Sequence, residues 1–273
     1  MFKSKILAHS LHPNGRDELI TFELTYPRII HGEFMTHRTH SRNSASSRAI
    51  PSKRMLKNII ENPFIPIHWG KNEPGMQAYA ELTGWRLKLA KFGWWYARSS
   101  SIIASRLMSF AGLHKQLANR VTETSMWITV ITTADISGWE NFWHLRCHHA
   151  AEPHIQKIAK MSKASFRESQ PVSLEYGEWH LPMILESELE ELPCSDLVKI
   201  STGRCARVSY LTHDGNRDAE KDIELHDRLV GSDPKHASPT EHQAEAVHDR
   251  SMCGNLNGDW SQYRKTISGE RYE

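Results

Sequence analysis

Residues 36–48 form the part of this sequence best suited to hold an anion. The segment contains two histidines, four serines and three arginines, and it has no acidic side chain. Guanidinium forks and hydroxyl groups donate charge-assisted hydrogen bonds to phosphate oxygens. A flexible Ser/Arg-rich tail has a similar composition, but the apolar residues that flank this segment favour a folded scaffold around it. The sequence therefore predicts an ordered phosphate-binding loop.

The residues before this loop predict a strand and a short helix that lead into it. Apolar and polar residues alternate over residues 18–26, which is typical of a half-buried strand. Pro27 ends that pattern, and residues 29–35 form a short apolar run that predicts a helix. We expect these elements to deliver the loop to its site.

Helical patterns dominate the remaining chain. Between residues 76 and 113, large apolar residues recur at three- and four-residue steps, and we expect this stripe to lie in the core. The stripe consists of Leu82, Trp85, Leu89, Phe92 and Trp95. Residues 185–196 are acidic and predict a surface connection. Helices are also predicted over residues 117–127, 136–148, 152–166 and 218–229. The fold class predicted is α+β, a helix-rich single domain with a small, mostly antiparallel sheet.

Composition excludes several classes of protein. In 273 residues, 34 Lys and Arg balance 32 Asp and Glu, which argues against a dedicated nucleic-acid binder. Four cysteines without CxxC spacing indicate neither a zinc module nor a disulfide framework. No apolar run approaches the ~20 residues that span a membrane, and no leader pattern is present. We therefore expect a cytoplasmic protein with no membrane partner.

Histidines are abundant, with 17 in the chain, and four of them lie close together in sequence. His144 and His148 are four residues apart on a predicted helix, with His149 and His154 just beyond. That spacing suits a metal site, but no carboxylate arrangement or HExxH pattern completes it. We expect structural or substrate-facing histidines and no metal. Neither a GxGxxG nor a Walker A loop is present.

The anion-binding segment contains a recognisable motif. His37 and Arg38, followed after seven residues by Ser46, resemble the signature of the flavin-dependent thymidylate synthases, Arg-His-Arg, seven residues and Ser. Asn43 and Arg48 also fall where that family has Asn and Arg. A second block downstream is similar to the same family. Residues 141–146, Asn-Phe-Trp-His-Leu-Arg, resemble its Asn-x-x-x-Leu-Arg helix, and residues 151–156 resemble the segment that follows.

A third block resembles the family but lies out of order. Residues 206–210, Ala-Arg-Val-Ser-Tyr, and 236–242, His-Ala-Ser-Pro-Thr-Glu-His, are similar to elements at the family's N-terminus. Circular permutation would explain this order, because termini usually lie at the surface and close together. The predicted single domain, residues 1–273, then has three parts. Residues 1–170 correspond to the family's later part, residues 200–248 to its N-terminal part, and residues 249–273 to an extra tail.

The resemblance implies an activity and a set of ligands. Members of this family bind FAD and use dUMP, methylene-tetrahydrofolate and NADPH to make thymidylate, as homotetramers with shared active sites. The expected function is therefore that of a methyltransferase of this type. The implied flavin contacts are Thr36, His37, Arg38, Asn43, Asp135, Asn141, Ser209, His236 and Ser238. The implied nucleotide contacts are Ser44, Ser46, Ser47, Arg48, Arg120 and Arg146.

Among these residues, Arg146 is the expected catalytic group, because a guanidinium facing the pyrimidine can stabilise negative charge on the ring. No protein nucleophile is required if reduced flavin supplies the electrons, so Ser46 is expected to be a ligand contact.

Several positions depart from the family pattern. Thr36 stands where the family has the first signature Arg, Ser44 replaces Glu, Glu33 replaces Gln, and Asp135 replaces Asn. One hypothesis is that Arg264, near the C-terminus, restores the lost cation and contacts the nucleotide. The changes also leave open a different pyrimidine, such as dCMP, or a different product, such as a hydroxymethylated nucleotide. A third possibility is a non-catalytic nucleotide- or RNA-binding protein that uses the Arg/Ser loop and tryptophan stacking.

Overall fold

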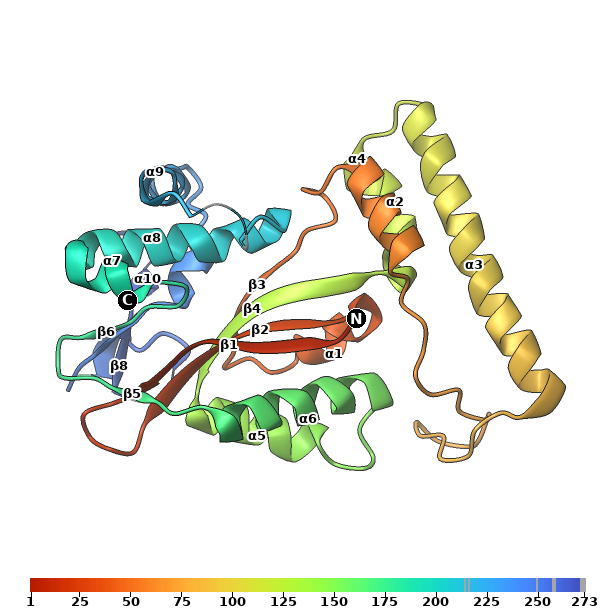
Figure 1. The fold of residues 1–273 in the computed structure, drawn as a ribbon, viewed down its shortest axis with the longest axis horizontal. Coiled ribbons are helices and arrows are strands. Elements are labelled where there is room, and N and C mark those ends of the chain that lie inside the picture. The colour runs from red at the N-terminus through yellow and green to blue at the C-terminus, as the bar shows by residue number, and fades with distance from the viewer. Residues whose placement is uncertain (214, 216, 249, 257–258, 271–273) are drawn as a thin grey trace.

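The computed structural model describes residues 1–213, 215, 217–248, 250–256 and 259–270. Within these residues, a main sheet of five strands has the spatial order β3-β4-β2-β1-β5 (Figure 1). The strands are β1 (Lys3–Leu11), β2 (Glu18–Pro27), β3 (Ser41–Ser44), β4 (Trp127–Asp135) and β5 (Val172–Ser173). All neighbours are antiparallel except β1 and β5. The mostly antiparallel sheet and the many helices confirm the predicted α+β class.

From β2 onward, the segments between the strands of this sheet form helices. They are α1 (His31–Phe34), α2 (Ser52–Glu61), α3 (Gly84–Phe110), α4 (Lys115–Ala118), α5 (Ile136–Arg146) and α6 (Pro153–Glu168), with the 3-10 helices η1 (Arg28–Ile30) and η2 (Arg120–Ser125). The predictions of a short helix before the loop and of helices at α5 and α6 are confirmed. Asp135 caps α5 by accepting from the Gly138 N–H at 2.8 Å, and Glu152 caps α6 in the same way. Both helices pack against β2.

The remaining chain forms a second layer and a small sheet. Its helices are α7 (Glu186–Glu191), α8 (Cys194–Ala206), α9 (Ala219–Val230) and α10 (Tyr263–Thr266), with η3 (Arg207–Tyr210), η4 (Ser238–Glu241) and η5 (Arg250–Met252). The antiparallel strands are β6 (Trp179–His180), β7 (Ala244–Ala246) and β8 (Trp260–Gln262). The amphipathic helix predicted over residues 218–229 is confirmed as α9. Gly203 permits close packing of α8 on α9, since a Cβ there would lie 2.3 Å from the Asp222 carbonyl oxygen.

Strand β2 was predicted correctly, but both of its faces are buried. Thr21, Glu23 and Thr25, on the face expected to be polar and exposed, are 0–8% exposed. The C-terminal half of the chain covers this face, and His213 pairs with the Glu23 carboxylate at 3.0 Å. The half-buried expectation was wrong because these polar side chains obtain hydrogen-bond partners inside the protein.

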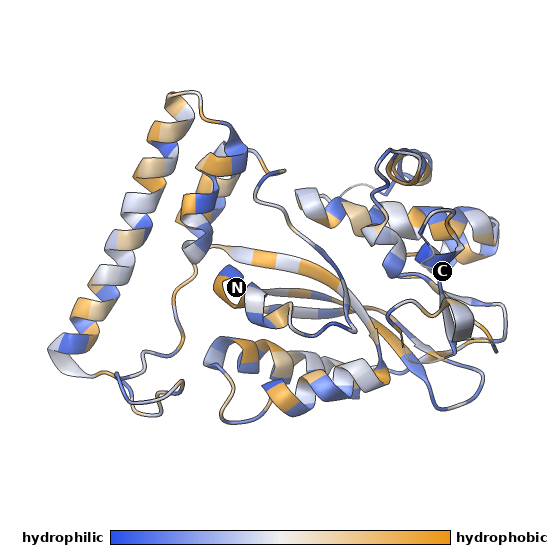
Figure 2. Ribbon diagram, turned by 180° about the vertical axis from the view of Figure 1, so that it is seen from behind, coloured by the Kyte–Doolittle hydropathy of each residue, from blue (hydrophilic) through white to orange (hydrophobic). Residues whose placement is uncertain are grey.

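Helix α3 was predicted correctly, but its expected burial was wrong. Only Ser105 of its 27 residues is buried. The large apolar residues of the stripe within α3 are 51–69% exposed, and Figure 2 shows apolar positions along the whole helix. In Figure 1, α3 stands at one side of the molecule, next to α4 and α2. Periodicity indicates that a helix has an apolar face, but it does not identify the surface that covers that face.

Two further expectations need correction. Residues 117–127 do not form one helix, because they divide between α4, η2 and the start of β4. The Asn119 side chain donates to the carbonyls of Ser47 and Ile50, and such side-chain bonds to the backbone compete with helix geometry. The acidic segment 185–196 is mostly exposed, as expected of a surface connection, and it contains α7 and the start of α8. The arginine- and serine-rich loop contains β3, which pairs with β4.

The tail predicted over residues 249–273 is only partly described, since residues 249, 257–258 and 271–273 lie outside the described residues. Its described part contributes β8 to the small sheet and so belongs to the folded body. No helix in the described part of the chain has the length and apolar character needed to cross a membrane.

Candidate functional site

The C-terminal end of α5 lies against the start of the arginine- and serine-rich loop. Arg146 donates from Nε to His37 Nε2 at 3.0 Å and from Nη2 to Thr36 Oγ1 at 3.2 Å. Its Nη1 is 3.9 Å from the Glu33 carboxylate, which is beyond hydrogen-bond distance. The loop approaches α5 closely at Gly138, where a Cβ would lie 2.9 Å from Thr39 Oγ1. The fold thus joins two motifs that are distant in sequence.

His37 is neutral in this arrangement. Burial, together with the nearby cations Arg146 and Arg42, lowers the pKa of His37 to about 4. Because Nε2 accepts from Arg146, the hydrogen-bond geometry assigns the ring proton to Nδ1. Arg42 points inward, donating to the His37 carbonyl at 2.9 Å, and so supports the loop from within. A neutral, oriented imidazole therefore fixes one edge of the Arg146 guanidinium.

A cavity of about 780 Å³ opens beside Arg146. Its walls come from α1, from the turn between α5 and α6, and from the segment that precedes α3. The lining side chains with polar groups are Glu33, His68, Gln77, Tyr79, Arg146, His149 and Glu152. Burial is the main cause that raises the pKa of Glu33, and the nearby Glu152 carboxylate adds to it. Both acidic and basic groups thus face one enclosed volume.

The serines predicted to hold a nucleotide lie in the second half of the loop. Ser46 N–H donates to the Ser209 carbonyl at 3.1 Å, and Ser47 Oγ donates to the Glu123 carboxylate at 2.9 Å. Arg48 and Arg120 are exposed, and Arg120 Nε donates to the Gln116 carbonyl. A second cavity, of about 350 Å³, is lined in part by Ser47. Ser44 is half-buried on β3.

The C-terminal block, residues 206–242, packs against β3. Ser209, in η3, touches the loop through its carbonyl, and η4 packs against β3. His236 and Ser238 are exposed at the start of η4, and no contact of the described residues joins them to Arg146. Asn43 is buried on β3. The predicted flavin contacts therefore fall into two groups, one around His37 and one around β3 and η4.

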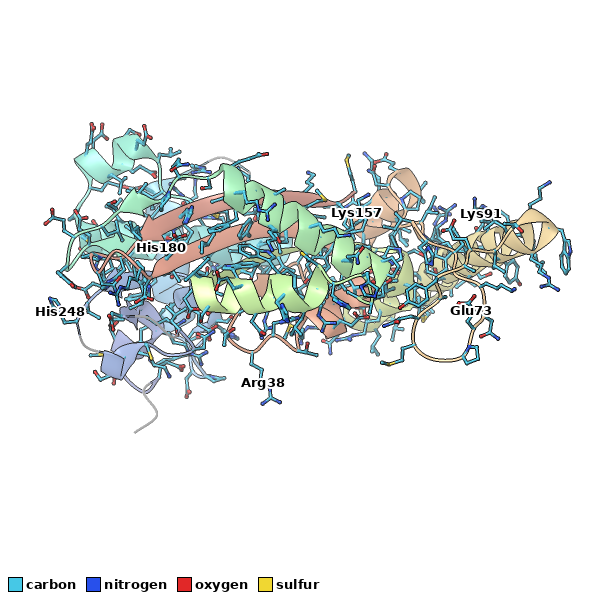
Figure 3. The ribbon with its side chains drawn as sticks, turned by 90° about the horizontal axis from the view of Figure 1, so that it is seen from below. Arg38, Glu73, Lys91, Lys157, His180 and His248 are labelled. Carbon is cyan, nitrogen blue, oxygen red and sulfur yellow. The ribbon has the colours of Figure 1, made fainter. Side chains whose placement is uncertain are left out.

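The structure places three other predicted site residues on α5, at its N-terminus or in the loop. Asp135 is the N-cap of α5, and its Oδ1 accepts from the Ser137 hydroxyl and the Gly138 N–H. Asn141 is exposed on α5. Arg38 projects from the body into solvent (Figure 3).

Arg264 forms ion pairs within its own region. Its guanidinium contacts the Glu241 carboxylate and donates to Glu270 at 2.6 Å and 2.8 Å. The structure does not bring it to Thr36 by any contact of the described residues, so the hypothesis that it restores a lost cation stays a prediction.

A chain of buried polar groups was not anticipated from the sequence. Ser10 Oγ lies 2.8 Å from His180 Nδ1, and His180 Nε2 lies 2.8 Å from Thr21 Oγ1. The Thr21 hydroxyl then contacts Thr133, which contacts His242 at 2.9 Å. Burial lowers the pKa of His180 and of His242 to about 3. The alternation of Thr with apolar residues in β2 and β4 was the available signal, but the histidine partners lie far away in sequence.

His154, one of the four histidines considered for a metal site, has other partners. His154 pairs with Glu152, and its Nε2 accepts from the Ile67 N–H at 3.0 Å. In the described residues, His12, Asp17 and Asp259 could approach a metal ion together, with ligand atoms within 4.8 Å of one another. The Asn14 amide nitrogen donates to both of those carboxylates, at 2.8 Å and 3.2 Å, so the cluster is held together by hydrogen bonds.

These features define an α+β protein with an arginine- and serine-rich loop beside a cavity. Residues 16–172, more than half of the chain, match the protein family described as thymidylate synthase complementing protein. The chain therefore belongs to this family, that of the flavin-dependent thymidylate synthases. The match includes the loop and the α5 motif but ends before residues 206–242. A comparison with curated proteins gave no match.

Two solved structures of the UMP/dUMP methylase PolB from Streptomyces cacaoi are similar to this chain. The structure bound with 5-Br dUMP is 17% identical, with a TM-score of 0.44, and the match covers 55% of this chain and 66% of that one. The structure bound with 5-Br UMP is 14% identical, with a TM-score of 0.49, and the match covers 62% and 89%. The chain thus spans just under two thirds of the length of the first structure.

Proposed function

We propose that this chain transfers a one-carbon unit to C5 of a deoxypyrimidine monophosphate with FAD as its flavin. The proposed donor is methylene-tetrahydrofolate, the proposed reductant is NADPH, and dUMP is the nucleotide expected from the family resemblance. Family membership supports this class of reaction. The observation that carries the proposal for this chain is the contact of Arg146 with His37 beside the cavity of about 780 Å³.

The side chains present fit such ligands. The cavity volume falls in the range of small-molecule sites, roughly 300–1,000 Å³. FAD and a nucleotide both carry phosphate groups, and Arg38, Arg48 and Arg120 are exposed guanidinium groups in or near the motif. When bound, FAD supplies the electrons for the transfer.

Arg146 is the proposed catalytic residue. The N–H groups on its Nη1 have no partner within hydrogen-bond distance among the described residues, since the nearest carboxylate oxygen is 3.9 Å away. They can donate to a pyrimidine carbonyl oxygen and stabilise charge that develops on the ring. His37 and Thr36 are proposed to position Arg146, because they accept from its Nε and Nη2.

A homotetramer is proposed as the working assembly, and α3 supports association. Its exposed apolar stripe is a patch of the kind that marks interaction sites, with the large side chains of the stripe from Trp85 to Trp95 51–69% exposed. Light scattering of the native chain and of Phe92→Ser/Trp95→Ser tests this proposal. A tetramer that the double variant weakens is expected, and a native monomer would contradict it.

Circular permutation is proposed for the C-terminal block. His12 Nε2 lies 3.2 Å from the Val247 carbonyl, so the end of this block adjoins the residues just before β2. Ser46 also contacts Ser209. A chain rearranged to run from residue 193 to 273 and then, through a linker, from residue 1 to 192 keeps all the described strands and should fold and bind flavin. Loss of folding in that order would argue against the proposal.

The function is tested by product analysis. The purified chain is incubated with FAD, NADPH, methylene-tetrahydrofolate and dUMP, or dCMP, and the nucleotides are identified by mass spectrometry. A C5-methylated product supports the proposal, and a hydroxymethylated product supports the alternative chemistry. Steeply salt-dependent oligonucleotide binding without flavin would instead support the non-catalytic binding protein and contradict the proposal.

A further inference from the structure

Two glutamates line the cavity beside Arg146. They differ in whether their carboxylate oxygens already accept hydrogen bonds from the protein. Glu152 Oε2 accepts from the N–H groups of His154 and Ile155, at 2.8 Å and 3.0 Å, and its Oε1 pairs with the His154 ring. The Glu33 carboxylate comes no closer than 3.9 Å to the Arg146 guanidinium, and its side chain is 42% exposed. Within the described residues, Glu33 is therefore the lining carboxylate with acceptor capacity left for a ligand.

Glu33 and Arg146 present an acceptor and a donor side by side on one wall. Arg146 is held by His37 and Thr36, so its Nη1 edge keeps a fixed direction next to Glu33. Two other polar side chains of the cavity are engaged. Gln77 Nε2 donates to the Ala150 carbonyl at 3.0 Å, and the Tyr79 hydroxyl donates to Gln77. Glu33 and Arg146 therefore offer a base an acceptor and a donor side by side in this cavity.

The chemistry of a carboxylate acceptor favours cytosine over uracil. Uracil has a single ring N–H on its pairing edge, flanked by two carbonyl oxygens that repel a carboxylate. Cytosine presents an exocyclic amine, and Asp or Glu accepting from that amine is an established recognition pair. Its N3 and O2 atoms are acceptors that suit the Arg146 N–H groups. A cytosine can thus satisfy both residues without placing like charges in contact.

We propose that Glu33 is the specificity-determining residue of the site and directs it toward deoxycytidylate. The inference rests on the proposed function and concerns the nucleotide that the same pocket selects. Glu33 accepts a hydrogen bond from the exocyclic amine, while Arg146 donates to the ring. Replacement of the carboxylate by an amide, which can also donate, removes this preference because an amide can bond to the O4 atom of uracil.

Equilibrium titration of the FAD-loaded chain with dCMP and with dUMP tests the proposal. The native chain is expected to bind dCMP more tightly than dUMP. Glu33→Gln should weaken dCMP binding at least tenfold and leave dUMP within threefold or tighten it. Glu33→Ala should weaken dCMP without improving dUMP. Glu73→Gln, on the same segment as Gln77 but outside the cavity lining, is the matched charge control and should leave both affinities unchanged.

The possible failures are distinguishable. If dUMP binds and the ratio of the two affinities is the same in the native chain and in Glu33→Gln, the inference is wrong while the proposed function stands. If the native chain binds neither nucleotide in the presence of FAD, the proposed function itself fails. Circular dichroism of each variant confirms that a lost affinity reflects the pocket and not an unfolded chain.

Discussion

Arg204 and Arg146 are both helical arginines, but the protein surrounds them differently. Arg204, on α8, is buried and donates to Asp222 at 2.9 Å, to the Met183 carbonyl at 2.8 Å and to both oxygens of Glu188. Arg146, at the end of α5, is 23% exposed and keeps its Nη1 edge toward a cavity. The first guanidinium is saturated by the protein, whereas the second has donors left for a ligand.

The histidines of this protein also include both buried residues with protein partners and exposed residues. His40, His180 and His242 are buried with hydroxyl or carbonyl partners, while His236 is exposed beside η4. Residue type alone does not reveal a functional role. The informative property is whether donors and acceptors remain available after folding.

The largest expected effect is the loss of stability when Arg204 is replaced. Arg204→Ala should lower the free energy of unfolding by about 3–5 kcal/mol, because Glu188 would lose the guanidinium that it contacts and the buried Asp222 would be left with Arg207. Urea denaturation measures this change. Arg146→Ala should cost less than about 1 kcal/mol, as expected for a partly exposed side chain. Equal losses of unfolding free energy in the two variants would contradict the distinction between a structural Arg204 and a ligand-facing Arg146.

The interior histidines should make stability depend on pH. Burial lowers the pKa of His40, His180 and His242 to about 3, whereas the unfolded chain has ordinary values near 6.5. Below pH 6.5 the unfolded chain therefore binds protons that the folded chain does not. Stability should fall as the pH drops from 6.5 toward 3, by up to about 4 kcal/mol per unit for the three together, and should not change with their titration above pH 7.5.

Unfolding midpoints in urea at pH 7.5, 6 and 5 measure this dependence. His180→Gln, which keeps hydrogen-bonding groups but does not titrate, should reduce the slope, whereas His236→Gln should not. A flat profile between pH 6.5 and 5 would show that the interior histidines are not buried in their neutral form.

Replacement of the Arg146 guanidinium should affect catalysis more than folding. Arg146→Lys is expected to lower turnover by about 10²–10³-fold, the usual effect of losing one charge-stabilising donor group, with an unchanged circular dichroism spectrum. Steady-state kinetics on the nucleotide for which the native chain forms product provide the measurement. A variant with native turnover would remove Arg146 from the proposed chemistry.

The smallest expected effect concerns the exposed cation of the loop. Arg48→Ala should raise the nucleotide KM by about tenfold, the equivalent of one charge-assisted hydrogen bond, with little change in turnover. Added salt should weaken nucleotide binding more in the native chain than in this variant. Lys53→Ala, a neighbouring surface cation on α2, serves as the control. Equal effects of both substitutions would indicate general charge attraction rather than a specific phosphate contact.

Local patterns predicted the elements that carry the motifs. Alternation in β2 and the 3.6-residue period in α5 and α6 depend on nearby residues, so they could be predicted from the sequence. The exposure of α3 could not be predicted, because a buried helix and a helix with an uncovered apolar face have the same 3.6-residue period in sequence. His180 and Arg204 carried no local signal either, since their partners come from distant segments. The family motif indicated Arg146 and His37, but only the fold revealed Glu33 beside the cavity.

The proposed function depends on a shared flavin and nucleotide pocket, and a visible absorption spectrum tests for that pocket most directly. The purified chain is measured before and after addition of FAD, and then with dUMP and with dCMP. We expect bound flavin whose absorption bands shift when a nucleotide enters the cavity beside Arg146. A colourless protein that takes up no FAD would contradict the account.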